Sequence, residues 1–167
     1  MREALSRFRK AREACEPNSV ALQTEDNCYL VANILDNAPA GFGVYRGTFE
    51  QSKTKAEYWS RIRLPEADVC RIDSKLTFYC IWPESDDAGT EVRSEEIVGA
   101  LSACKNLGNP TITEAKYETP ARRWWTLYVK FADRTNIMII RSFWKPNEKQ
   151  PTAKWELSLE IDAQVQQ

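Results

Sequence analysis

Histidine is absent from all 167 residues of the chain. Imidazole is the usual general base near neutral pH and the usual nitrogen ligand of zinc, so its absence excludes Ser-His-Asp and Cys-His catalysis and every histidine-ligated metal site. Glycine is also scarce, with six residues, and no GxxxxGK[ST] or GxGxxG phosphate-binding loop occurs. We therefore expect a protein that is not an enzyme and that binds no metal and no cofactor.

Long apolar runs are missing as well. No run approaches the roughly 18 apolar residues that span a bilayer, and the opening segment REALSRFRKAREACE lacks the apolar core of a signal peptide. The formal net charge is −1, which gives no overall attraction to nucleic acid or to anionic lipid. The sequence predicts no transmembrane segment and no nucleic-acid partner.

The composition that remains is that of a globular protein. Hydrophobic residues make up 43% and charged residues 28% of the chain, and a chain of this length buries enough surface to build one core. We expect a single domain over residues 1–167. Five cysteines are present, and an odd number leaves at least one of them unpaired within a monomer.

Three segments are candidate helices. Residues 2–15 place apolar side chains at helical spacing and predict an amphipathic helix. The run NCYLVANILD, with Asp26 as its cap, fits either a short helix or a buried strand. Ser94 is positioned to cap the helix SEEIVGALSACKNL, which Gly108 would end.

The candidate strands form a hairpin and a meander. The segments VCRI and LTFYCIW face each other across a turn near Asp73, Ser74 and Lys75. Three later segments, RWWTLYVKFAD, IMIIRSFW and WELSLEID, are separated by turns, and the first and last alternate apolar and polar residues. These patterns predict an α+β domain in which an antiparallel sheet, made of the hairpin and a C-terminal three-strand meander, carries N-terminal and central helices on one face.

Carboxylates are the remaining candidates for acid–base chemistry. They gather after Trp82 and at the start of the central helix, at Glu84, Asp86, Asp87, Glu95 and Glu96. Such clusters in loops and first helical turns usually face solvent or the helix dipole. A carboxylate-dependent hydrolase is therefore kept only as an alternative, because it needs two of these groups across one cleft.

A strand with arginine and aromatic residues gives the candidate binding surface. In PARRWWTLYVKF, strand alternation sends Trp125 into the core and leaves Arg122, Trp124, Tyr128 and Lys130 on the open face. Aromatic residues and arginine are favoured at protein interfaces, so we predict a partner-binding surface at Arg122, Trp124, Tyr128 and Trp144. A binder of single-stranded nucleic acid that uses residues 122–130 is the alternative.

Cys70 and Cys80 flank the hairpin turn. Their spacing is not that of a CxxC motif, and a zinc site without histidine would need four scattered thiolates. With a three-residue loop, Ser74 to Leu76, Cys70 lies opposite Cys80 on the same face, close enough for a disulfide. With a two-residue loop, their side chains point to opposite faces and Cys80 would instead meet Cys104.

The order FGVYRG, LPEADVC, FYCIW and a helix ending in AC resembles a class of small, largely uncharacterised bacterial envelope proteins and lipoproteins with an LPxAxxC...YxCxW...C arrangement. The resemblance covers about residues 42–107 and matches Cys70, Cys80 and Cys104, although FYCIW lacks the residue between Tyr and Cys. It leaves Cys15 and Cys28 outside, where they would pair with each other. It implies an exported, periplasmic or otherwise extracytoplasmic protein; the missing signal sequence keeps a cytoplasmic location as the alternative.

Together these features predict a non-catalytic protein-binding module of the bacterial cell envelope. An immunity or inhibitor protein is one specific version, because a small acidic domain without an active site suits that role. We expect a protein partner and a monomer or weak dimer.

Overall fold

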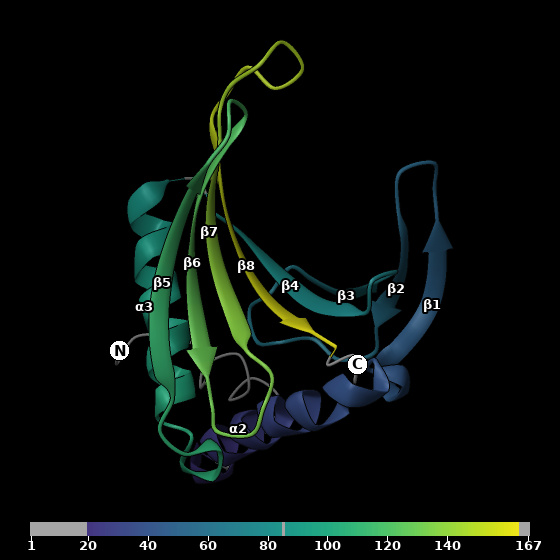
Figure 1. The fold of residues 1–167 in the computed structure, drawn as a ribbon, viewed down its shortest axis with the longest axis vertical. Helices are drawn as coiled ribbons and strands as arrows, with labels where there is room; N and C mark the ends of the chain where they lie inside the picture. The colour runs from purple at the N-terminus through teal and green to yellow at the C-terminus, as the bar shows by residue number, and fades with distance from the viewer. Residues whose placement is uncertain (1–19, 85, 164–167) are drawn as a thin grey trace.

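The computed structural model describes residues 20–84 and 86–163 of the chain (Figure 1). Its main feature is one antiparallel sheet with the strand order β1-β2-β3-β4-β8-β7-β6-β5. The eight strands are β1 Arg46–Gln51, β2 Ala56–Ser60, β3 Val69–Asp73, β4 Thr77–Glu84, β5 Thr111–Glu118, β6 Arg122–Lys130, β7 Ile137–Trp144 and β8 Lys154–Asp162. The helices are α2 Val20–Asn37 and α3 Asp87–Ser102, with short 3-10 turns η1 Ala38–Ala40, η2 Gly43–Tyr45 and η3 Lys105–Leu107.

The predicted α+β class is wrong, because the described chain is mainly β. The expected hairpin and meander are parts of one eight-stranded sheet, which the antiparallel pairing of β4 with β8 joins. Strands β1 and β5 extend the sheet at its two edges. Nearly every residue of β5 is exposed, so β5 lacks the apolar alternation that would mark a strand in the sequence. The helix predicted for residues 2–15 lies outside the described residues.

The sheet is strongly curved, and its two faces differ. Figure 1 shows α3 beside the sheet and α2 across the ends of the strands. The apolar core lies on the face that α3 covers, where Phe78, Ile139, Leu159 and Ile161 are buried. We call this the helix face. No helix among the described residues packs on the opposite face, which we call the open face.

Helix α3 begins earlier than its sequence suggests. The Asp86 side chain accepts a hydrogen bond of 2.6 Å from the backbone N–H of Gly89, and Asp86 itself is extended, as expected for an N-cap. The predicted cap at Ser94 is wrong, since Ser94 lies inside the helix and its hydroxyl donates to the Glu91 carbonyl. Because Ser94 is buried with Ile97, it contributes to the face that packs on the sheet.

Helix α2 resolves the ambiguity of the NCYLVANILD run in favour of a helix. It starts at Val20, six residues before the expected cap at Asp26. A disulfide between Cys28 of α2 and Cys104, just after α3, joins the two helical segments. The predicted pair of Cys15 and Cys28 is therefore wrong, and Cys15 itself lies outside the described residues. None of the described helices is long and apolar enough to cross a membrane.

The hairpin between β3 and β4 has the three-residue loop. Cys70 lies directly opposite Cys80 in the strand register, and the two form a disulfide with a Cα–Cα distance of 4.1 Å. The Asp73 carboxylate fixes the turn by accepting hydrogen bonds of 2.9 Å from the N–H groups of Lys75 and Thr77. This confirms the cross-strand bridge, and the alternative pairing of Cys80 with Cys104 is wrong.

Candidate functional site

The open face gathers all four residues of the predicted partner-binding surface. Arg122, Trp124 and Tyr128 occupy alternate positions on β6, and the register places Trp144 of β7 opposite Arg122. On the other side of β6, Tyr117 of β5 lies opposite Trp124. We call these five residues the aromatic cluster.

Arg122 lies at the centre of the aromatic cluster. Its guanidinium carbon lies 5.0 Å from the Trp124 ring centroid and 4.6 Å from that of Trp144, within cation–π range. One guanidinium nitrogen donates to the Ser142 hydroxyl, while Nε is buried without a hydrogen-bond partner among the described residues. Burial lowers the pKa of Arg122, against the opposing attraction of Glu156. The guanidinium is thus held by rings rather than by a carboxylate.

Tyr117 extends the cluster to the edge of the sheet. Its ring stacks on Trp124 with a centroid distance of 5.4 Å, and its hydroxyl lies 3.4 Å from that of Tyr128. That hydrogen bond is the main reason why the pKa of Tyr128 is raised. The Tyr117 side chain is 45% exposed. The sequence did not reveal Tyr117 because β5 carries no apolar alternation.

Carboxylates lie beside the aromatic cluster on the open face. Glu160 of β8 lies opposite Tyr79 of β4 and Met138 of β7. Burial raises the pKa of Glu160, although the Ser158 hydroxyl donates to its carboxylate at 3.3 Å. Burial thus disfavours the charged form of both Glu160 and Arg122 on this face.

A second polar cluster on the open face lies on β2, β3 and β4. The Arg71 guanidinium carbon lies 3.9 Å from the Trp59 ring centroid, and Arg71 pairs with the buried Glu57. Tyr79 donates its hydroxyl to the same carboxylate. Burial alone would raise the pKa of Glu57, but the hydrogen bonds from Tyr79 and Arg71 hold it below its ordinary value. Glu57 thus has its charge partners within the fold, although Nε of Arg71, like that of Arg122, is buried without a hydrogen-bond partner among the described residues.

Three of the five carboxylates proposed for a hydrolase are engaged in structural contacts. Glu84 accepts a hydrogen bond of 2.7 Å from Arg93, Asp86 caps α3, and Asp87 pairs with Arg141. Glu95 is exposed on α3, whereas Glu96 is buried on the same helix. In the part of the chain that the structure describes, no group of three or more Cys, Asp or Glu side chains is arranged to hold a metal ion.

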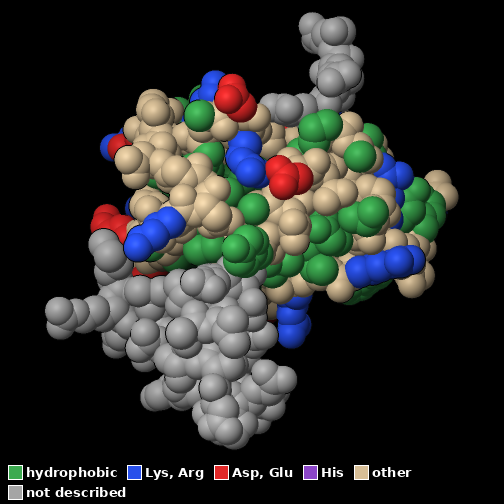
Figure 2. Space-filling view, turned by 90° about the horizontal axis from the view of Figure 1, so that it is seen from below, with side chains coloured by type: hydrophobic (Ala, Val, Ile, Leu, Met, Phe, Trp, Pro, Cys, Tyr) green, Lys and Arg blue, Asp and Glu red, His purple; other side chains and the backbone are tan. Residues whose placement is uncertain are grey.

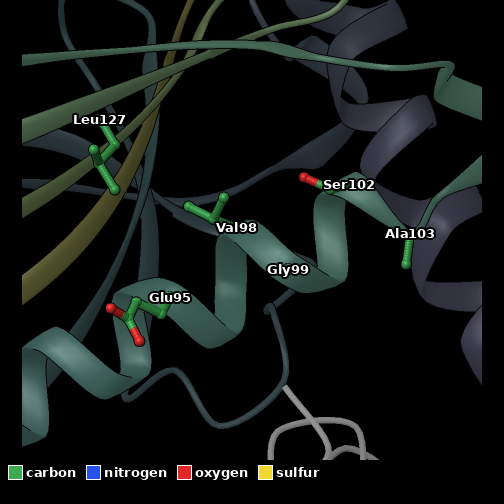
Figure 3. A pocket seen from close by; sticks show the side chains of 6 residues that line it. All are labelled: Glu95, Val98, Gly99, Ser102, Ala103 and Leu127. Atoms are coloured by element: carbon green, nitrogen blue, oxygen red, sulfur yellow. The ribbon is translucent and has the colours of Figure 1, made fainter.

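An apolar groove lies on the helix face between α3 and β6 (Figure 3). Its volume is about 540 Å³, and Val98 and Leu127 point into it from the helix and the strand. Glu95 and Ser102 lie along the helix side of the groove. The helical spacing of residues 95, 98, 99 and 102 was the only signal in the sequence for this groove.

Hydrophobic side chains are also exposed at the end of the molecule where α2 lies. Viewed from that end, they form a broad band with lysine and arginine side chains at its margins (Figure 2). Tyr29 of α2 is 59% exposed. The aromatic cluster is distinguished from this surface by its specific ring–arginine and ring–ring geometry.

No protein-family model, no curated protein and no solved structure matches the chain. The resemblance to bacterial envelope proteins therefore stays a prediction.

Proposed function

We propose that the protein is a non-catalytic binding module that holds a protein partner on the aromatic cluster. The observation that carries this proposal is the position of Arg122 between the rings of Trp124 and Trp144, with Nε left unpaired. Tryptophan, tyrosine and arginine are the residues that most often dominate binding energy at protein interfaces. Here they are already packed against one another, so a partner would meet a largely preorganised surface.

The charges around the cluster favour a protein over single-stranded nucleic acid. Glu156 and Glu160 lie close enough to influence the pKa of Arg122. Phosphate backbones are bound by surfaces with a clear excess of positive charge, whereas this face mixes both signs. The stacking surface of Trp124 is also shared with Tyr117, which leaves less ring area for a base.

The two disulfides support an extracytoplasmic location for this module. Disulfides form and persist mainly in oxidising compartments such as the bacterial periplasm, and both bridges here use buried cysteines. We place the protein in the bacterial cell envelope, with an immunity or inhibitor protein as the specific version. An enzyme is not proposed, because Glu84 and Asp87 are paired with arginines and Asp86 caps α3.

Site-specific photo-crosslinking tests the binding surface. A photoreactive phenylalanine analogue placed at Trp124, in cells of the source organism, should form a covalent adduct with one protein partner. The matched control carries the same analogue at Arg123, which precedes Trp124 on β6 and points to the helix face, with its side chain 45% exposed. We expect an adduct from position 124 and none from position 123.

The partner found in this way then allows affinities to be compared. Trp124→Ala and Arg122→Ala should each weaken binding about 30-fold or more, which is the usual effect of truncating an interface hot spot, whereas Arg123→Ala should leave binding unchanged. Equal affinities for all three variants would contradict the site. A steep loss of affinity with salt for an isolated oligonucleotide would favour the nucleic-acid alternative instead.

A further inference from the structure

Strand β5 is a regular edge of the sheet that carries charged side chains but no proline and no bulge. It is the last strand in the order, so among the described residues its outer backbone groups have no partner strand. It contains eight residues without proline or a register shift, and it pairs with β6 continuously from Thr111 to Glu118. The opposite edge, β1, is shorter and has a shifted register between Arg46 and Phe49. Long regular edges are templates for pairing with another strand.

The residues of β5 are complementary to a second copy of the same strand. In an antiparallel pair with a two-fold axis at Ala115, Glu114 of each copy lies opposite Lys116 of the other, and Thr113 lies opposite Tyr117. Moving the axis to Glu114 or to Lys116 places two like charges opposite each other. The side chains of Glu114 and Lys116 are 51% and 68% exposed, and their loose ion pair of 3.8 Å within one chain would be exchanged for pairs between the copies. The small Ala115 side chain would sit on the axis. Opposite charges directly across an antiparallel pair stabilise it, and like charges destabilise it.

We propose that two copies of this chain pair through β5, antiparallel and centred on Ala115, to form one continuous sheet across a two-fold axis. Helix α3 packs over β4, β7 and β8. In β5, Ile112 and Tyr117 remain 43% and 45% exposed. Pairing would partly cover both side chains. It would also bring the Tyr117 side chains of the two copies to the same face of the joined sheet.

Charge reversal at the two positions tests this arrangement through its symmetry. Glu114→Lys puts two lysines opposite each other at both symmetric sites, and Lys116→Glu does the same with two glutamates. Each single variant should weaken the dimer at least about tenfold. The double variant E114K/K116E should restore it. An equimolar mixture of the two single variants should also form a dimer, because each lysine then lies opposite a glutamate.

Sedimentation equilibrium over a concentration series measures these dissociation constants, and far-UV circular dichroism confirms that each variant is folded. Both positions are exposed, so we expect folding to be retained. A wild-type protein that stays monomeric would overturn the proposal. So would a dimer that both single variants leave unchanged, or a mixture of the single variants that remains monomeric. None of these measurements involves the partner of the aromatic cluster.

Discussion

At the scale of single residues, the open face is unusual for the polar groups that it buries. Ser142 and Thr126 are 1% and 3% exposed, although no described helix covers them. Ser142 lies opposite Trp124 and accepts a hydrogen bond from Arg122, so larger neighbours shield it instead. Glu160 lies on the same face, where burial raises the pKa of its carboxyl group. A face that shields polar groups with its own aromatic side chains is partly desolvated before any partner arrives.

Glu160 gives a test of this desolvation. Its raised pKa means that the folded protein binds the proton more tightly than the unfolded chain, so stability falls as pH rises through that range and stays lower at neutral pH. Glu160→Gln is uncharged at every pH. We expect it to raise the melting temperature at neutral pH, and this gain should vanish below about pH 4, where the wild-type carboxyl is protonated.

Calorimetry at neutral and acid pH measures this difference. The exposed Glu148, changed to Gln, provides the control and should alter the melting temperature little at either pH. A Glu160→Gln variant that is less stable than the wild type at neutral pH would show that the attraction of Arg122 outweighs burial.

At the scale of elements, the start of α3 depends on one side chain. Asp86 accepts a hydrogen bond from the N–H of Gly89. Asp86→Ala should therefore lower the free energy of unfolding by about 1 kcal/mol, whereas Asp86→Asn, which keeps an acceptor, should cost less. Ser94→Ala should have a smaller effect than Asp86→Ala, because the Ser94 hydroxyl bonds only to a carbonyl within the helix. Urea unfolding measures the free energy of unfolding of all three variants. A larger loss of stability from Ser94→Ala than from Asp86→Ala would show that Ser94, and not Asp86, matters most for the start of α3.

The strands and helix α3 also show which elements can be located from a pattern in the sequence. Alternation of apolar and polar residues correctly located β6 and β8, although burial itself does not alternate along β6, where Trp125 is only half-buried and Thr126 on the open face is buried. The start of α3 was missed because DAGTEVRS carries no apolar stripe, and its buried positions there are Thr90 and Ser94. The edge strands were missed because a strand with little burial leaves no period in the sequence.

The sequence predicted only part of the aromatic cluster. Alternation along β6 placed Arg122, Trp124 and Tyr128 on one face, as the register shows. Tyr117 could not be found, because its place beside Trp124 depends on the pairing of β5 with β6. The bridge between Cys70 and Cys80 was one of two alternatives that depended on the loop length, whereas the bridge from Cys28 to Cys104 depends on how two distant helical segments pack.

At the scale of the whole molecule, β8 connects the two halves of the sheet. It pairs with β4 from Trp155 to Asp162, and with β7 on its other side. Leu157 lies at this junction, opposite both Trp82 and Arg141, and its side chain is completely buried. Because both halves depend on the same strand, the sheet should unfold as one cooperative unit.

Leu157→Ala tests this dependence. The substitution should lower the free energy of unfolding by about 2–5 kcal/mol, the usual cost of a cavity in a packed core. Tryptophan fluorescence and far-UV circular dichroism should still report the same single transition in urea, with both disulfides intact. Leu127→Ala, at the partly buried wall of the groove, should cost less. Separate transitions by the two probes would show that β1 to β4 and β5 to β8 unfold independently, and that β8 does not bind the sheet into one unit.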